Sequence, residues 1–212
     1  MSKEKYSSQL KQKGFTLIEL MMSIFIFSML CIGLFTLYNS FFTNYKTTSK
    51  SLDKDDQARK VTFTFITELR NATWGNDGSY PVNQATNTQF IFYSTSSTNS
   101  AIINRVRYYI SNNVLYKGVI TPTGSPLSYN PSNEVITTVE NALSNNNDPV
   151  FLYYDDNYSG TTAALSQPVN LTTVKFVKIN LELTNTGGVT NTQKYTIDAG
   201  AAIRNLKTNL GN

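Results

Sequence analysis

The chain of 212 residues contains no histidine and a single cysteine. Without histidine, neither a serine–histidine nor a cysteine–histidine nucleophile pair can form, and no imidazole is present to bind a metal ion. One cysteine also excludes an intrachain disulfide. These absences argue against histidine-dependent hydrolases and imidazole metal sites, and we expect a protein that is not an enzyme and has no cofactor.

Helix-breaking residues are scarce in the N-terminal third. No proline precedes Pro81, and Gly33 is the only glycine between residues 15 and 74. We therefore expect one long helix over about residues 15–72. Apolar residues recur at steps of three and four in its C-terminal part, which predicts a stripe packed on a sheet, with charged residues between them on a solvated face. The stripe is Ala58, Val61, Phe65, Leu69 and Ala72, and the solvated residues are Arg59, Lys60, Glu68 and Arg70.

Charge is nearly absent from the first half of this helix. Between residues 15 and 45 the only Asp, Glu, Lys or Arg is Glu19, and the 23 residues from Phe15 to Leu37 are apolar enough to form a membrane segment. As a helix, this length crosses a bilayer about 30 Å thick. A carboxylate in such a segment costs roughly 2.5 to 3.5 kcal/mol and is rarely kept without a partner.

Three sources of a cation for Glu19 are open: the basic leader, another chain, or an amine created at Phe15 by cleavage. The alternative is an acidic residue at the edge of a simple anchor, with its carboxylate extended toward the lipid headgroups. Cys31 lies in the same segment, where a small buried hydrophobe is favoured over lipidation or intermolecular pairing.

Residues 1–14 hold four lysines against one glutamate. Positive charge beside a membrane helix stays on the cytoplasmic side, so we expect the rest of the chain outside. Secretory signals are cleaved after their apolar region, whereas Gly14 precedes it, so cleavage there leaves the helix on the mature protein. Removing the leader lowers the formal net charge from +4 to about +1, so the basic excess does not indicate nucleic-acid binding.

The sequence from Gly14 to Glu19, Gly-Phe-Thr-Leu-Ile-Glu, resembles the cleavage motif of type IV prepilins and pseudopilins. The resemblance implies that a prepilin peptidase cuts after Gly14, that Phe15 becomes the N-methylated terminus, and that Glu19 is the assembly carboxylate. It also implies a single-pass protein of the cytoplasmic (inner) membrane. Its expected partners are other pilin or pseudopilin subunits, the peptidase and the inner-membrane assembly platform.

This reading divides the chain into a leader (1–14), a transmembrane or filament-core helix (15–45) and an exported part (46–212). We expect an α+β, type IV pilin-like fold in which the helix packs on antiparallel β-sheet. Segments with period-two patterning predict strands. They are residues 89–93, 104–110, 114–119, 150–154, 174–183 and 194–197.

Two hairpins are expected among these strands. Asn112 and Asn113 tolerate positive φ and predict a tight turn between the second and third segments. A second hairpin loop is expected around residues 184–192. Residues 122–147 are expected to be rich in loops, with either a short helix or an irregular strand at 134–143.

Three segments carry a narrower resemblance. The hairpin around Arg107–Lys117, together with residues 151–155 and 202–206, resembles the J-type minor pseudopilins of type II secretion and their minor-pilin relatives. This implies a low-copy subunit near the tip of a pilus or pseudopilus, in complex with other minor subunits.

A different function class is a membrane-anchored tip module that binds DNA or a surface. Arg105, Arg107 and Tyr109, with Tyr108, Tyr116 and Lys117, place cations and aromatics on one hairpin, which is the chemistry of a single-stranded nucleic-acid platform. A half-exposed strand shows the same alternation, however, and residues 76–171 hold six acidic against three basic residues. The filament-subunit reading is therefore favoured.

One loop has candidate oxygen ligands for a cation. Asp155 and Asp156 stand before Asn157 and Gly160, and such oxygens are ligands for Ca²⁺. The spacing is not that of an EF-hand loop, so a solvated turn without metal is the favoured interpretation.

Overall fold

The computed structural model describes residues 14–95, 101–141, 143–146, 148–185 and 193–206, with side chains for all of these except 44, 46–58, 184, 185 and 193–195. The chain forms two compact units, residues 1–48 and 49–212. One helix, α1 (Leu17–Arg70), begins in the first unit and ends in the second. The predicted long helix is thus confirmed, two residues shorter at each end than expected.

The second unit contains a five-stranded antiparallel sheet in the order β1-β2-β3-β4-β5. Its strands are β1 (Val82–Ala85), β2 (Gln89–Thr95), β3 (Ile103–Ser111), β4 (Val114–Ile120) and β5 (Val135–Glu140). Strands β2, β3 and β4 confirm the predicted segments, whereas β1 was not predicted. The segment at 134–143, for which a helix or a strand was expected, forms the strand β5 after a short 3-10 turn, Pro131–Asn133.

The turn between β3 and β4 is the one that the asparagines predict. Ser111 pairs with Val114 across the turn, and Asn112 and Asn113 have φ angles of 49° and 63°. Positive φ at both central residues gives the two-residue turn whose twist matches that of the flanking strands. The hairpin expected here is therefore confirmed.

A second, three-stranded antiparallel sheet has the order β6-β7-β8. Its strands are β6 (Phe151–Tyr154), β7 (Phe176–Asn185) and β8 (Gln193–Ala202). The register runs from Phe176 opposite Ala202 to Asn185 opposite Gln193, which confirms the second hairpin. Its loop, residues 186–192, lies outside the described residues. Strand β8 is longer than predicted. Short 3-10 turns lie before β7, at Leu171–Thr173, and after β8, at Arg204–Leu206.

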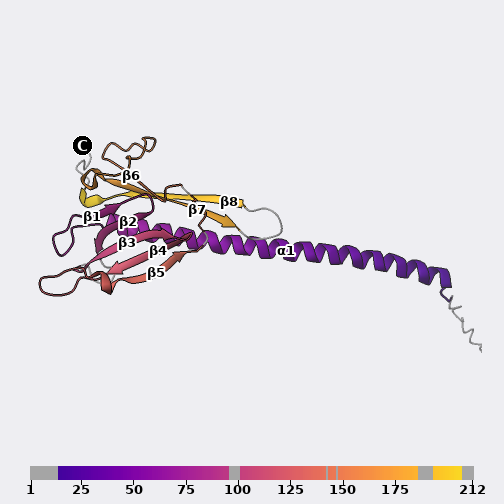
Figure 1. Cartoon of the computed structure of the whole chain (residues 1–212). Helices are drawn as coiled ribbons and strands as arrows, with labels where there is room; N and C mark the ends of the chain where they lie inside the picture. Colours follow the sequence, from indigo (N-terminus) through magenta and orange to yellow (C-terminus); the bar gives the residue numbers. More distant parts are fainter. Residues whose placement is uncertain (1–13, 96–100, 142, 147, 186–192, 207–212) are drawn as a thin grey trace, which may run out of the picture. The chain divides into compact units, whose positions relative to one another are not determined.

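The core of the second unit forms where the last turns of α1 lie between the two sheets (Figure 1). The predicted apolar stripe is buried at Val61, Phe65, Leu69 and Ala72, while the Ala58 side chain lies outside the described residues. The ring of Phe65 is fully buried and contacts rings from both sheets: Tyr108 at 5.2 Å, Phe151 at 6.0 Å, Phe90 at 6.2 Å and Phe92 at 6.3 Å between centroids.

Candidate functional site

The N-terminal candidate residues lie at the start of α1. The helix begins at Leu17, so Thr16 occupies the N-cap and Glu19 is the third helical residue. The Glu19 carboxylate accepts hydrogen bonds from the backbone N–H and the hydroxyl of Thr16, both at 3.0 Å, and the Glu19 N–H donates to the Thr16 Oγ1 at 3.4 Å. This reciprocal arrangement is a capping box, which satisfies two helix-end donors.

Thr16 is a partner of Glu19 that the sequence interpretation missed. Only a cation from the leader, another chain or the Phe15 amine was considered, although the spacing Thr-x-x-Glu is the signal for a capping box. Thr16 brings no positive charge. In hydrocarbon the Glu19 carboxylate therefore still needs a cation, because its charge is not neutralised by these hydrogen bonds.

The Gly14–Phe15 peptide bond precedes the helix. Both residues are exposed, and the Phe15 side chain is 81% exposed. Backbone outside a helical hydrogen-bond ladder and open to solvent is the form that proteases cut. A Cβ at Gly14 would meet no atom within 4 Å, so the chain itself does not require a glycine there. The basic residues of the leader lie outside the described residues.

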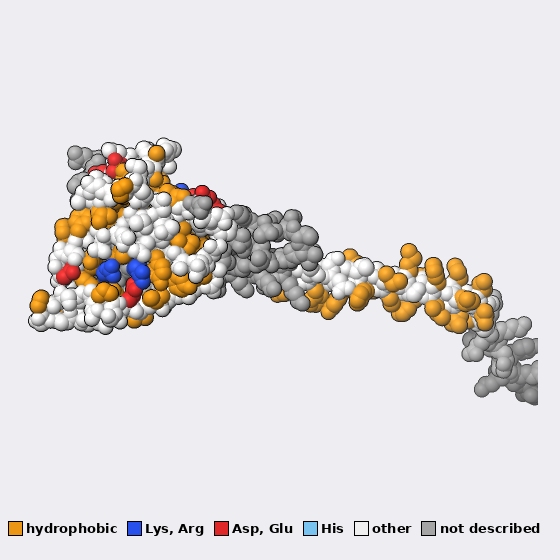
Figure 2. All heavy atoms as spheres, in the orientation of Figure 1, with side chains coloured by type: hydrophobic (Ala, Val, Ile, Leu, Met, Phe, Trp, Pro, Cys, Tyr) orange, Lys and Arg blue, Asp and Glu red, His pale blue; other side chains and the backbone are white. Residues whose placement is uncertain are grey.

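The N-terminal part of α1 has the length and composition of a membrane span. Residues Leu17–Thr43 form this candidate span, and none of them is buried in the structure. Figure 2 shows its hydrophobic side chains along the helix. An apolar surface of this size on a water-soluble monomer is rare and marks contact with a membrane or a partner.

Four hydroxyl groups within this span are satisfied by the helix itself. Ser23, Ser28, Thr36 and Thr43 each donate a hydrogen bond of 2.8 Å to a backbone carbonyl one turn earlier. Such bonds remove the cost of an unpaired polar group in an apolar surrounding. Glu19 is therefore the one ionised side chain in the span whose burial calls for an external partner. Cys31 lies exposed in the same segment.

The three candidate ligand residues of the hairpin share one face of the five-stranded sheet. Arg105, Arg107 and Tyr109 alternate along β3, so their side chains point the same way. The Arg107 guanidinium lies 4.1 Å from the centroid of the Tyr109 ring, and that ring stacks on Tyr116 at 5.2 Å. Arg107 is also neutralised by two hydrogen bonds to Glu134, at 2.8 and 2.5 Å. Binding of a ligand here stays a prediction.

Tyr108 and Lys117 lie on the opposite face, toward α1. They pair across β3 and β4, and both bind Glu68: the Tyr108 hydroxyl donates to its carboxylate at 2.8 Å, and the Lys117 ammonium forms an ion pair with it. Tyr108 and Lys117 therefore share the hairpin with Arg107, as expected, but lie on the opposite face of the sheet from it. The expectation that Glu68 lies on the solvated face is also wrong, because its side chain is turned toward the sheet.

Burial and the neighbouring Glu68 carboxylate hold the pKa of the Tyr108 hydroxyl well above its usual range, with burial the larger cause. Both effects disfavour the phenolate, because a second negative charge would be placed in a poorly solvated site next to a carboxylate. Tyr108 is therefore a neutral donor, and the three groups form a structural cluster.

The loop after β6 forms a solvated turn. Asp155 Oδ1 accepts a hydrogen bond from the Asn157 N–H at 3.0 Å, which is the local bond of an Asx-turn. Among the residues that the structure describes, no group of three Asp, Glu, His or Cys side chains lies close enough to bind a metal ion.

One comparison with known proteins identifies a motif. Residues 9–35 match the family model of the prokaryotic N-terminal methylation motif, which covers 27 of the 212 residues. No curated protein matches the chain. The match contains Gly14, Phe15 and Glu19 together with the first part of the apolar helix. The chain thus carries the N-terminal methylation motif at the start of a single apolar helix that leads into an antiparallel β domain, which is an α+β, type IV pilin-like fold.

Proposed function

We propose that this protein is a minor pilin or pseudopilin, a low-copy structural subunit near the tip of a type IV pilus, a type II secretion pseudopilus or a competence filament. The observation that carries the proposal is the position of Glu19: an ionisable residue inside an apolar and exposed helix, within the methylation motif. A simple membrane anchor gains nothing from a carboxylate at this depth, whereas an assembling subunit uses it to select a partner.

The mechanism begins with processing of the leader. Cleavage after Gly14 by a prepilin peptidase creates an amine at Phe15, which is then N-methylated and remains a cation. This amine and the Glu19 carboxylate, of the same or a neighbouring subunit, neutralise each other in the membrane or filament core. Each charge alone costs several kcal/mol there, so assembly supplies the missing partner. The leader lies on the cytoplasmic side of the membrane, and the second unit lies outside. Incorporation of the subunit into the filament requires the inner-membrane assembly platform.

The alternative, a membrane-anchored module that binds DNA or a surface, has less support. Its central cation, Arg107, is held by Glu134 and stacked on Tyr109, which leaves Arg105 as the cation of that face. A single-stranded nucleic-acid site needs a continuous basic groove. Retention of the full-length protein on single-stranded DNA at low salt tests this reading.

The proposed function is tested by replacing Glu19. Glu19→Ala makes the helix more apolar, so insertion into the membrane should persist, and cleavage should persist too. Incorporation should fail, because removing one partner of a buried ion pair costs about 3 to 5 kcal/mol, which corresponds to a loss of association of roughly 100-fold or more. The measurement is the fraction of subunit recovered in sheared filaments at matched expression.

Glu19→Gln is the matched control for helix capping. A glutamine at the third helical position preserves a capping box with Thr16 but carries no charge. If the carboxylate acts as a charge, Glu19→Gln should fail to incorporate as severely as Glu19→Ala. Normal incorporation of the Gln variant would reduce Glu19 to a helix cap and remove the assembly role.

A further inference from the structure

Strand β5 forms an open edge of the five-stranded sheet. It is the last strand in the sheet order and pairs only with β4 among the described residues. Val135 and Ile136 are 65% and 50% exposed, and Thr137 and Thr138 are exposed as well. Residues 135–139 contain no charge and no proline. Natural proteins usually protect free edges with charged residues or proline. An edge without them is therefore a surface on which another strand can pair.

The other sheet edges are guarded. Strand β1 has four residues and a register shift between Val82 and Gln84. Strand β6 is equally short, and the N–H of its first residue, Phe151, donates to the Asn87 carbonyl. Strand β8 carries Asp198, which pairs with Lys178 on β7 at 2.8 Å. Short length, bulges and charges are devices against edge pairing. Strand β5 has its own register shift between Thr138 and Glu140, so the part of its edge without a bulge or a charge is Val135 to Thr138.

The β5 edge is held in a fixed position before any partner arrives. Glu134, the residue before β5, binds Arg107 on β3, and the Thr137 hydroxyl donates to the Lys117 carbonyl on β4 at 3.3 Å. An interface whose backbone is already ordered loses little conformational entropy on binding. Such a strand is suited to accept a partner through its outward backbone groups.

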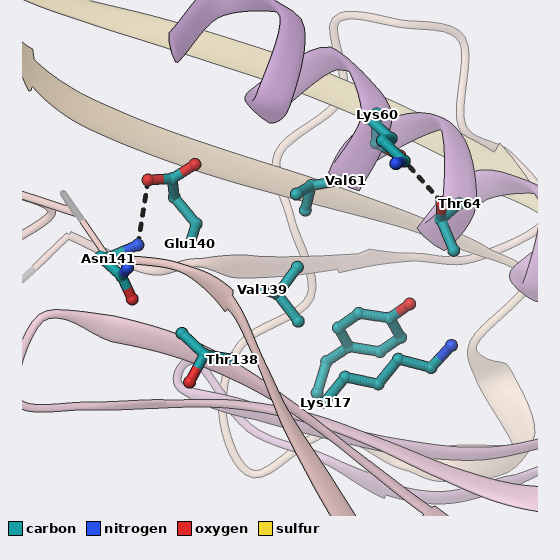
Figure 3. A pocket seen from close by; sticks show the side chains of 9 residues that line it. Lys60, Val61, Thr64, Lys117, Thr138, Val139, Glu140 and Asn141 are labelled. Atoms are coloured by element: carbon teal, nitrogen blue, oxygen red, sulfur yellow. Dashed lines mark hydrogen bonds between the residues drawn. The ribbon is translucent and has the colours of Figure 1, made fainter. Parts of the chain in front are cut away.

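A pocket of about 450 Å³ lies between this edge strand and α1. Figure 3 shows Lys60, Val61 and Thr64 of the helix on one side, Thr138, Val139 and Glu140 of β5 on the other, and Lys117 below. Its volume is within the range of about 300 to 1,000 Å³ that ligand pockets have. The valines and the ring of Tyr108 make part of its wall apolar, so it fits a side chain that has an apolar stem.

Lys60 gives the pocket a positive rim. Its side chain is exposed and forms no ion pair with any described residue, whereas Lys117 is neutralised by Glu68. The Glu140 carboxylate accepts a hydrogen bond from the Asn141 N–H. This carboxylate lies at the far end of the pocket from Lys60 in Figure 3. A carboxylate on the incoming segment is therefore the group that complements Lys60.

We propose that β5 accepts an extended segment of a neighbouring filament subunit as an additional strand, with an apolar side chain in the pocket and a carboxylate at Lys60. Backbone hydrogen bonds along the edge supply affinity, and the pocket selects among side chains, as in other cases of strand addition. This inference rests on the proposed function, because it requires subunits that are already held together by their helices.

A free-standing dimer of two β5 strands is the less suitable occupant. An edge of six residues is only about 20 Å long, and stable interfaces bury at least about 1,200 Å². Pairing β5 with β5 also needs a two-fold axis, whereas subunits that stand parallel in a filament meet through different surfaces. The β5 edge is suited to form a second contact between neighbouring subunits that are already held together by their helices, because their effective concentration is then high.

The test uses the full-length protein in the cells that produce it, with a photo-crosslinking benzoylphenylalanine at Thr138 and, as control, at the exposed Thr196 of β8. We expect a crosslink from position 138 only, to a second subunit that carries its own N-terminal methylation motif. The crosslinked segment should contain an apolar residue and, within about three residues of it, an acidic one. A crosslink no stronger than that from position 196, or one joining two β5 strands, overturns the proposal.

Charge reversal supplies the second arm. Lys60→Glu should reduce the yield of the crosslink from position 138 at least about tenfold. A loss of only about 1.4 kcal/mol in binding free energy corresponds to this factor. Arg59→Glu is the matched control, because Arg59 is equally exposed and adjacent but does not line the pocket, and it should change the yield less than twofold. Equal effects of the two variants overturn the assignment of Lys60.

Glu19→Ala separates this inference from the proposed function. If Glu19→Ala blocks incorporation into filaments but position 138 gives no crosslink in the wild type, only the β5 proposal fails. If Glu19→Ala incorporates like the wild type, the proposed function fails, whatever position 138 shows.

Discussion

The carboxylate of Glu134 receives two hydrogen bonds from the guanidinium of Arg107, from Nε at 2.8 Å and from Nη2 at 2.5 Å. Glu134 precedes β5 and Arg107 lies on β3, so the Glu134 side chain passes over β4 between them. It passes at Gly118, where a Cβ would lie 2.1 Å from the Glu134 Oε1. The absent side chain of Gly118 therefore allows a bidentate pair to fasten the start of β5 to the centre of the sheet.

Gly118→Ala should break this pair. The added methyl group would displace the Glu134 carboxylate and leave the half-buried guanidinium without its partner, which costs about 1 to 3 kcal/mol. The measurement is equilibrium unfolding of the full-length protein in detergent, followed by the fluorescence of Trp74, the only tryptophan. Trp74 packs against Tyr80 at 5.3 Å between centroids, so it reports on folding of the second unit.

A double-mutant cycle identifies the cause. In a Glu134→Ala background no carboxylate passes over position 118, so Gly118→Ala should cost far less there than in the wild type. An equal cost in both backgrounds would mean that the glycine is needed for another reason, such as local backbone conformation.

Phe65→Ala should remove the centre of the core. The fully buried ring contacts four aromatic rings from two sheets, and a truncation of this kind costs about 3 to 5 kcal/mol. Phe63→Ala, on the same helix but 72% exposed, is the matched control and should stay within about 0.5 kcal/mol of wild type. Unfolding followed by Trp74 fluorescence measures both, and similar costs for the two variants would contradict the assignment of the core.

The elements that were predictable from the sequence are those specified by local pattern. Phe65 and Leu69 are identified as core residues by their helical spacing alone, and Asn112 and Asn113 specify their turn through backbone conformation. Strand β1 was not predictable, because its four residues follow Pro81 and show no alternation of apolar and polar side chains.

The contacts that the sequence did not predict join residues that lie far apart along the chain. Glu68 looks like a solvated helix residue until Lys117, 49 positions later, is brought against it. The pairing of Arg107 with Glu134 depends on a glycine in a third strand, which no local pattern reveals. The Thr16–Glu19 box, by contrast, is local and was predictable from its spacing.

Stability should fall in alkaline solution, in part because of Tyr153. Its hydroxyl donates to the Thr86 carbonyl at 2.7 Å, and burial raises its pKa well above the usual value. Above pH 10, near the pKa of an unfolded tyrosine, the unfolded chain releases this proton and the folded chain keeps it. The contribution of the protonated Tyr153 hydroxyl to the unfolding free energy is therefore complete below about pH 10. It is lost as pH rises, by up to about 1.4 kcal/mol per pH unit.

Tyr153→Phe isolates this effect. The variant loses a hydrogen bond, which lowers stability by a similar amount at every pH, but it has no proton to release at this position. The unfolding free energy of the variant should therefore fall less steeply between pH 10 and 11 than that of the wild type. Parallel curves for the two proteins would show that Tyr153 does not contribute to the alkaline loss.

Gly14→Val should prevent processing without disturbing the fold. A side chain at position 14 meets no atom within 4 Å in the protein, so any effect must arise in the peptidase, whose site is expected to accept only a small residue before the cut. The leader, with its four lysines and one glutamate, would then stay attached. Its net positive charge would hold the subunit in the membrane with the leader on the cytoplasmic side.

Mass spectrometry of the purified proteins gives the readout. The wild type should begin at Phe15 and carry one methyl group, Gly14→Val should retain Met1 or its successor, and the control Gly33→Val should be processed normally, because Gly33 lies within the helix and also has free space around it. A wild-type protein that keeps its leader in cells with an active peptidase would contradict the assignment of Gly14. It would also leave Glu19 without the Phe15 amine, so the charge pairing that we propose for assembly could not form within this subunit.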